Sequence, residues 1–352
     1  MQSEIENSKS KIIPPFLKPG DLLRVIAPSG ALREFATFEK GVEIWRSRGY
    51  KVEIYPQIDE KWGYLAGKDE TRRNQLAAAW QDPECRGILC ARGGFGSTRI
   101  LENWNWGVGE RGSGGQERQG GRQGDKETRR QEDKKNNSSF SPSPHPSIFH
   151  SPPPPKWLIG FSDITALLWS LEKAGISGVH APVLTTLSSE PDWSIQRLFD
   201  WVEGRPIASL KGSGWGGGIA KGILLPANLT VATHLLSTPF QPNLDNVILA
   251  FEDVTEAPYR IDRMLTQWRM SGALSKVSGI ALGNFTKCEA PADVPSLSVE
   301  EVLRDRLSDL NIPVVSNLSF GHEAPNAALP VGVMATLDGD EGILSVGASV
   351  TD

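Results

Sequence analysis

The chain has 352 residues, of which 39% are hydrophobic and 22% charged, a composition typical of a globular protein that buries its core without disulfides. The formal net charge of -5 gives no electrostatic basis for binding nucleic acid. The sequence contains no apolar run of about 18 residues, no signal-peptide core and no cysteines at metal-ligand spacing. We therefore expect a cytoplasmic protein with no nucleic-acid partner, no membrane association and no metal.

Short apolar runs alternate with helical patterns through the first part of the chain. We expect strands at 22–27, 51–55 and 86–90, and helices at 36–47 and 68–80. A further strand at 157–159 leads into a turn and a helix, with apolar residues at helical spacing from Ile164 to Leu171. This alternation predicts an N-terminal α/β domain over 17–190 with a parallel, helix-covered sheet, preceded by a flexible N-terminus at 1–16.

The composition changes abruptly between Gly107 and Pro155. This stretch is rich in Gly, Gln, Arg, Ser and Pro and has only four large apolar residues: Val108, Phe140, Ile148 and Phe149. Such a segment cannot bury enough apolar area to offset the entropy of ordering it, so we interpret it as a disordered insertion. A recognition arm is the alternative, because basic Gly/Arg stretches and Pro-rich tracts also serve that role.

The second half shows short strand patterns with fewer helices. A linker is expected at 191–218, followed by a C-terminal α+β domain over 219–352. Its expected strands are 247–251, 277–282, 314–320 and 342–346, and its expected helix is 260–270.

Ser162 lies where a predicted strand passes into a helix, within Gly160-Phe161-Ser162-Asp163. A serine at such a turn projects its hydroxyl away from the sheet, and backbone N–H groups at the helix start point toward the atom that it attacks. An ordinary helix-capping serine explains the same pattern.

A nucleophilic serine needs a base, and three histidines lie outside the insertion. His322 follows a predicted strand and a glycine, so it is the best candidate. His234 lies among leucines and valines in a predicted helix, where we expect a packing residue. For His180 we favour a structural role.

Two carboxylates end the apolar strand at 247–251. Either Glu252 or Asp253 is suited to orient a histidine, but not both, because neighbouring strand residues face opposite sides of a sheet. Ion pairs with Arg260 or Arg263 are the alternative. The glycine-rich turn at 92–96 can bring backbone N–H groups close to a ligand, so the N–H of Gly94 is a candidate oxyanion donor. A plain turn is the alternative.

The ordered set of these motifs resembles the LD-carboxypeptidase family, serine peptidases that include microcin-immunity-like proteins. The resemblance covers about 17–101 and 156–335 and rests on seven segments: 18–21 leading to 27–29, 92–96, 159–165, 228–230, 251–254, 259–263 and 321–322. Ala227 and Ala181 stand where the family's pattern has glycines.

The resemblance implies that Ser162 is the nucleophile, His322 the base and Glu252 its partner, with an oxyanion hole from the N–H groups of Asp163 and Gly94. The implied fold has a doubly wound, flavodoxin- or Rossmann-like N-terminal sheet, and the active site lies between the two domains. The implied assembly is a homodimer without cofactor. The implied activity removes the terminal D-alanine from a murein tetrapeptide, a small peptide substrate of cell-wall recycling. A microcin-immunity-type amidase acting on peptidyl-nucleotide conjugates and a non-catalytic peptide-binding protein are the alternatives.

Arginines such as Arg92 are candidates for recognising the substrate's terminal carboxylate, but nothing in the spacing of the motifs selects one.

Overall fold

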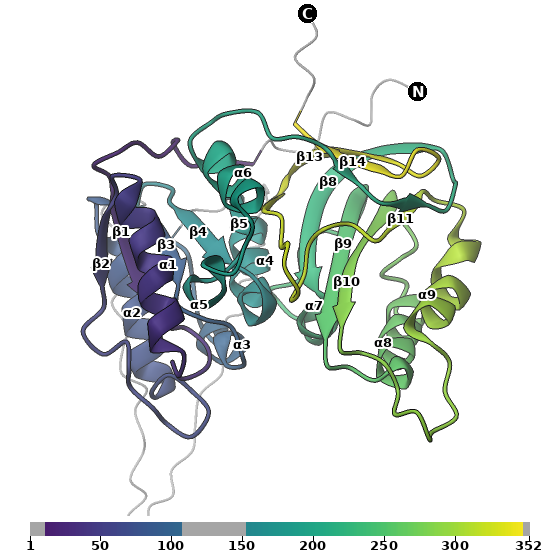
Figure 1. Cartoon of the computed structure of the whole chain (residues 1–352), viewed down its shortest axis with the longest axis horizontal. Coiled ribbons are helices and arrows are strands. Elements are labelled where there is room, and N and C mark those ends of the chain that lie inside the picture. The colour runs from purple at the N-terminus through teal and green to yellow at the C-terminus, as the bar shows by residue number, and fades with distance from the viewer. Residues whose placement is uncertain (1–10, 108–152, 348–352) are drawn as a thin grey trace, which may run out of the picture.

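A computed structural model describes residues 11–107 and 153–347. Two halves lie side by side, each built on its own sheet (Figure 1). The predicted insertion falls mostly on 108–152, outside the described residues. Of the N-terminus predicted to be flexible at 1–16, residues 1–10 also lie outside them. Residues 11–16 are anchored, since Ile12 pairs with Ile176 beside the core and the Trp157 indole N–H donates to the Pro15 carbonyl at 3.0 Å.

The N-terminal sheet has six strands in the order β12-β5-β4-β3-β1-β2. Five of them are parallel, and they are β1 (Leu22–Ile26), β2 (Lys51–Ile54), β3 (Cys85–Cys90), β4 (Trp157–Gly160) and β5 (Gly178–His180). The order 5-4-3-1-2 is that of a flavodoxin-like doubly wound fold, so the predicted fold class is confirmed.

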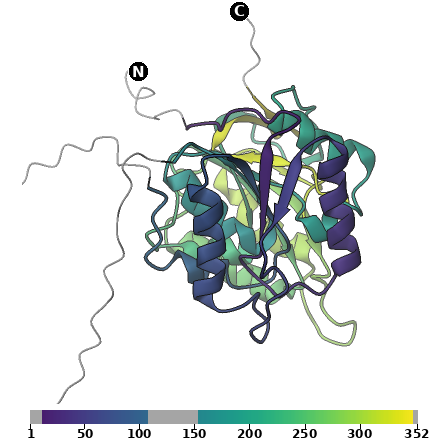
Figure 2. The same ribbon diagram turned by 90° about the vertical axis from the view of Figure 1, so that its left-hand side faces the viewer.

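Helices cover both faces of this sheet, and Figure 2 shows α1 and α2 on opposite sides of it. One face packs against α1 (Phe35–Ser47), α5 (Leu184–Leu187) and α6 (Asp192–Val202). The other face packs against α2 (Asp69–Gln81), α3 (Ser97–Leu101) and α4 (Thr165–Lys173). The segment predicted as a linker thus holds α6, whose Leu198, Phe199 and Val202 are buried in the N-terminal core.

The C-terminal sheet has eight strands in the order β6-β14-β13-β8-β9-β10-β11-β7. Its parallel centre consists of β8 (Ile219–Asn228), β9 (Val247–Val254), β10 (Gly279–Thr286) and β11 (Val314–Ser316). Short antiparallel strands complete its two sides, namely β6 (Leu210–Lys211), β7 (Ser213–Gly214), β13 (Val333–Asp338) and β14 (Ile343–Val346).

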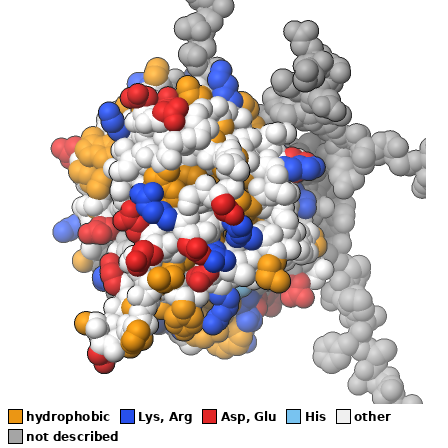
Figure 3. Space-filling model, turned by 90° about the vertical axis from the view of Figure 1, so that its right-hand side faces the viewer, with side chains coloured by type: hydrophobic (Ala, Val, Ile, Leu, Met, Phe, Trp, Pro, Cys, Tyr) orange, Lys and Arg blue, Asp and Glu red, His pale blue; other side chains and the backbone are white. Residues whose placement is uncertain are grey.

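Three helices belong to the C-terminal half: α7 (Leu229–Leu235), α8 (Pro258–Met270) and α9 (Val299–Leu307). Two 3₁₀ turns, η2 (Ser162–Ile164) and η3 (Ser308–Leu310), complete the described elements. Acidic and basic side chains are interspersed with small apolar groups on the outer face of this half (Figure 3). Within the described ranges, no helix combines the length and apolar character needed to cross a bilayer.

The two halves share a strand and a core. The last strand of the N-terminal sheet, β12 (Leu329–Val331), comes from the C-terminal half of the chain and pairs antiparallel with β5. One apolar cluster continues from α4, through Leu167 and Trp169, to Phe251 on β9 and Trp268 on α8. The carboxyl ends of β4 and β9 are therefore held in a fixed relation to each other.

Candidate active site

The backbone at Ser162 adopts an unusual conformation. The residue follows β4 after Phe161 and begins η2, with φ of +63° in the left-handed region. A residue with a Cβ occupies this region at a cost of about 1–3 kcal/mol, and such strain collects at functional sites. The Ser162 hydroxyl does not cap the following helix; its Oγ lies 2.9 Å from Nε2 of His322.

His322 connects the serine to a buried carboxylate. Its Nδ1 lies 2.6 Å from Oε2 of Glu252, and Glu252 is fully buried at the end of β9. Gly321 permits this approach, since it has φ of +132° and an added methyl group would lie 3.3 Å from Cβ of Glu252. The structure thus joins Ser162, His322 and Glu252, the three residues singled out in the sequence, in one chain of contacts.

The surroundings of His322 favour its protonated form. Burial opposes the positive charge, but the charge of Glu252 and its hydrogen bond outweigh burial and raise the pKa of His322 above 6.5. An imidazole with Nδ1 bonded to a carboxylate presents Nε2 to its neighbour, which is the arrangement that a general base requires.

Asp253 faces away from the histidine, as the alternation of strand residues requires. Its carboxylate accepts hydrogen bonds from Nδ2 of Asn228 at 3.0 Å and from the backbone N–H of Thr230 at 2.9 Å. Burial and the charge of Glu252 raise the pKa of Asp253 to about 6, against the hydrogen bonds that it accepts. Neither carboxylate forms the ion pair with Arg260 or Arg263 that the sequence offered as an alternative; Arg260 pairs with Glu256 instead.

The glycine-rich turn touches the serine. A methyl group on Gly93 would lie 3.0 Å from Cβ and 3.2 Å from Oγ of Ser162, so a side chain at this position would press against the serine. Gly94 and Asp163, the two predicted oxyanion donors, both line the cavity that contains Ser162. This location is also the switch point of the sheet between β1 and β3, where doubly wound folds bind their ligands.

The cavity has a volume of about 990 Å³ and lies between the two halves. Its wall combines apolar side chains, such as Phe95, Leu235 and Phe240, with the carboxylates of Glu102, Asp253 and Glu256. Arg92 is not part of this wall. Its guanidinium donates to the Ala31 carbonyl at 2.7 Å and lies 3.8 Å from Glu34.

The expectation that His234 is a packing residue is wrong, since it is exposed and lines the cavity. Its apolar neighbours in α7 face the core, and His234 lies on the opposite side of this short helix. His180 is fully buried between the rings of Phe161 and Phe320. Burial lowers its pKa to about 4, so its imidazole is neutral at pH 7.

Sequence reasoning missed the residues that hold the His322 loop. Oδ1 of Asn326 accepts from the Gly321 backbone N–H at 3.0 Å, and the Asn326 backbone N–H donates to Glu190 at 2.8 Å. Nothing in the local pattern predicts the bond between Asn326 and Glu190, which are 136 residues apart in the chain. Across the described ranges, no group of three or more His, Cys, Asp or Glu side chains is placed to hold a metal ion.

Two family models match the chain. Residues 23–112 match the LD-carboxypeptidase N-terminal domain, and residues 221–337 match the LD-carboxypeptidase C-terminal domain. The first match carries the glycine-rich turn, and the second carries Glu252 and His322.

Relatives from several bacteria match nearly the whole chain. A Synechocystis protein named as a carboxypeptidase is 52% identical over 96% of this chain and 98% of its own length. The murein tetrapeptide carboxypeptidase of Pseudomonas aeruginosa is 27% identical over 90% of this chain and 92% of its own. The crystal structure of muramoyltetrapeptide carboxypeptidase from Oxalobacter formigenes superposes with a TM-score of 0.71 at 26% identity, covering 93% of this chain and 99% of that one.

Proposed function

The chain belongs to the LD-carboxypeptidase family, and on that premise we propose that it is a serine carboxypeptidase that removes the terminal D-alanine from a murein tetrapeptide. The observation that carries this proposal is the chain of contacts from Glu252 through His322 to Ser162 at the wall of a peptide-sized cavity. The names of the relatives from Pseudomonas and Oxalobacter support the choice of substrate.

The reaction begins with transfer of the Ser162 proton. Nε2 of His322, 2.9 Å from the hydroxyl, takes the proton as Oγ attacks the carbonyl carbon of the scissile bond. Glu252 holds the imidazole by Nδ1 and stabilises the positive charge that forms on the ring.

The attack places a negative charge on the former carbonyl oxygen. The N–H groups of Asp163 and Gly94, which flank Ser162 in the cavity wall, are the proposed donors to this oxygen. Donors fixed in advance stabilise the charge without reorganising during the reaction, because the fold has already positioned them.

The tetrahedral intermediate then collapses. His322 gives its proton to the nitrogen of D-alanine, the C–N bond breaks, and the tripeptide stays as an ester on Ser162. Water, deprotonated by His322, attacks this ester; the proton returns to Ser162 Oγ and the tripeptide leaves. The first step balances with the side chains alone, and the second consumes one water molecule.

The test is to incubate the protein with purified murein tetrapeptide and to measure free D-alanine and tripeptide by mass spectrometry. We expect equal amounts of both products and none with Ser162→Ala. A parallel incubation with a peptidyl-nucleotide conjugate tests the amidase alternative. Hydrolysis of that conjugate without release of D-alanine from the tetrapeptide would contradict the proposal. The predicted homodimer and cytoplasmic location stay predictions.

A further inference from the structure

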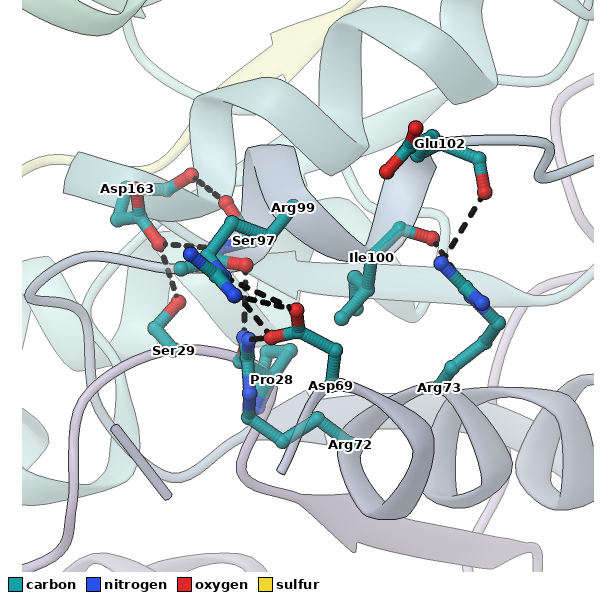
Figure 4. A network of polar contacts seen from close by, with 11 residues as sticks. Pro28, Ser29, Asp69, Arg72, Arg73, Ser97, Arg99, Ile100, Glu102 and Asp163 are labelled. Atoms are coloured by element: carbon teal, nitrogen blue, oxygen red, sulfur yellow. Dashed lines mark hydrogen bonds and ion pairs between the residues drawn. The ribbon is translucent and has the colours of Figure 1, made fainter. Parts of the chain in front are cut away.

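Asp163, the residue after Ser162, connects three loops through its carboxylate (Figure 4). Its Oδ2 accepts from the Ser29 hydroxyl at 2.6 Å and from the Ser97 backbone N–H at 2.8 Å. The Asp163 carbonyl also accepts from the Ser97 hydroxyl. Ser29 follows β1, Ser97 follows β3 and Asp163 follows β4, so the residue connects the carboxyl ends of three neighbouring strands.

These bonds fix the glycine-rich turn against the nucleophile. Ser97 is the first residue of α3 and ends the turn at 93–96, and the Gly30 backbone N–H donates to the Gly93 carbonyl at 3.1 Å. The turn is therefore anchored at two points. Ser97 holds its end, and Gly30 holds Gly93, which itself lies against Ser162. A movement of either anchor changes the distance between Ser162 Oγ and the N–H of Gly94.

A buried arginine secures the same loops from the side of α2. The guanidinium of Arg72 donates through Nη1 to the carbonyls of Pro28 and Gly96, and its Nη2 pairs with Asp69. Arg99 from α3 pairs with Asp69 as well, at 2.6 Å (Figure 4). Arg72 thus holds the two loops to α2, while Asp163 holds them to the nucleophile turn.

Burying a carboxylate is costly unless hydrogen bonds satisfy it, and Asp163 has 2% of its surface exposed. The strained backbone of Ser162 likewise persists only where the surrounding structure determines it from several directions. Both costs fall at adjacent residues, and the hydrogen bonds of Asp163 offset part of the cost of its burial. A role in folding alone does not require that a buried carboxylate and a strained backbone occur at adjacent residues beside the nucleophile.

We propose that Asp163 is a positioning residue whose side chain fixes the separation between the glycine-rich turn and the nucleophile turn. At this separation, Ser162 Oγ and the two oxyanion donors reach the same carbonyl group of the substrate. This inference rests on the proposed function. It adds a role for the carboxylate to the role already given to the backbone N–H of the same residue.

The first experiment measures how fast a fluorophosphonate labels Ser162. In this reaction the Oγ–P bond forms as the P–F bond breaks, fluoride leaves, the serine proton passes to His322, and the P=O oxygen takes the place of the carbonyl oxygen. The labelling rate reports the nucleophile and the oxyanion donors without depending on the peptide substrate.

Asp163→Ala should lower the labelling rate by about 10²-fold, which is the effect of a misplacement on the order of 1 Å at a reacting centre. Asp163→Asn keeps an acceptor oxygen for Ser29 and Ser97, so it should restore most of the rate. With murein tetrapeptide, Asp163→Ala should lower kcat and leave KM nearly unchanged, because the lost interaction acts in the transition state.

Asp69→Ala is the matched control, since it removes the ion pairs of Arg72 and Arg99 and leaves the bonds of Asp163 in place. It should lower the denaturation midpoint and leave the labelling rate of the folded protein near that of the wild type. If Asp163→Ala does not fold, Ser29→Ala, which removes one of the two donors to Oδ2, should show a smaller loss of the same kind.

The outcomes are separable. A wild-type protein that is not labelled would overturn the proposed function, and this inference with it. This inference alone would be overturned if the wild type is labelled and folded Asp163→Ala is labelled at the same rate. If Asp163→Ala does not fold, the same result with folded Ser29→Ala would overturn it. So would an equal loss of rate in Asp69→Ala, because the effect would then reflect a general loosening of the loops.

Discussion

The two halves of the molecule hold their parts of the candidate active site by different means. In the N-terminal half, Ser162 is fixed by its backbone, through a left-handed turn, the contact with Gly93 and the buried bonds of Asp163. In the C-terminal half, His322 lies on a loop that follows β11 and is held through its side chain by Glu252. The position of Ser162 therefore depends on backbone conformation and packing, whereas the orientation of the His322 ring depends on its pairing with the charged Glu252.

This difference predicts which half responds to which perturbation. Changes of pH act on the charged pair of the C-terminal half, whereas changes of side-chain shape act most strongly around the tightly packed nucleophile turn. Substitutions at the Glu252–His322 pair and around Ser162 therefore separate the contribution of charge to activity from that of packing.

The largest effect is expected at the nucleophile itself. Ser162→Ala should leave the fold intact and lower kcat by on the order of 10⁶-fold, as removal of a nucleophile does when a triad acts as a unit. The measurement is D-alanine release from murein tetrapeptide. Adding His322→Ala should cause little further loss, and near-normal hydrolysis by Ser162→Ala would refute the mechanism.

The next effect tests the charge in the C-terminal half. Glu252→Gln should lower kcat by about 10⁴-fold, because the amide no longer stabilises the imidazolium or fixes its tautomer. The base acts only when neutral, and its pKa is raised above 6.5, so kcat/KM of the wild type should rise with pH through a midpoint above 6.5. Removing the negative charge lowers the pKa of His322, which moves this midpoint to lower pH.

Glu323→Gln is the control for this prediction. Glu323 follows His322 in the chain but is exposed, so solvent screens its charge. The pH profile of this variant should match that of the wild type. A profile of Glu252→Gln that keeps the wild-type midpoint would show that another group sets the pKa of His322.

A smaller effect is expected from the loop that carries His322. Asn326→Ala removes the acceptor of the buried Gly321 N–H, which should lower the free energy of unfolding by about 1–3 kcal/mol. Urea denaturation measures this loss. Asn243→Ala removes a comparable bond to the Asp245 N–H at an exposed position and should cost less than about 0.5 kcal/mol. Equal losses in both variants would argue against the proposed anchoring of the loop.

The smallest effect is expected from residues 108–152. Their composition predicts no contribution to the core, and the entropy of loop closure changes by only about 0.6 kcal/mol per doubling of length. Replacing them with a short Gly/Ser linker should leave stability and hydrolysis nearly unchanged. A linker variant that folds but loses most of its activity would indicate that the segment takes part in substrate binding.

Local patterns predicted most of the N-terminal half. Apolar runs between turn residues gave the strands near their observed bounds. An example is 157–159 against β4, where every residue is buried, because a strand buried on both faces is continuously apolar. The turn at Ser162 was also visible in the sequence. The same reasoning left out α9, although Ser298 and Glu301 form a capping box that signals the start of a helix.

Contacts between distant segments could not be predicted in this way. The Asn326 backbone N–H donates to Glu190, which is 136 residues away in the chain, and no local signal marks this bond. His234 was misjudged for a related reason, since its neighbours in sequence are apolar but it faces the cavity. Local patterns gave Ser162, His322 and the pair Glu252 and Asp253 as candidates, and the family resemblance selected the triad among them. The fold supplied the residues that hold the His322 loop.

The crossing of β12 into the N-terminal sheet has a consequence for synthesis on the ribosome. Ser177 and Val331, which form a hydrogen bond across the edge between β5 and β12, are 154 residues apart in the chain. At ordinary elongation rates β12 emerges roughly 8 to 30 s after β5, and until then the edge of β5 lacks its partner. An unpaired edge is a template for association with other chains. The nascent protein therefore depends on the last part of its chain both to cover this edge and to bring His322 to the nucleophile.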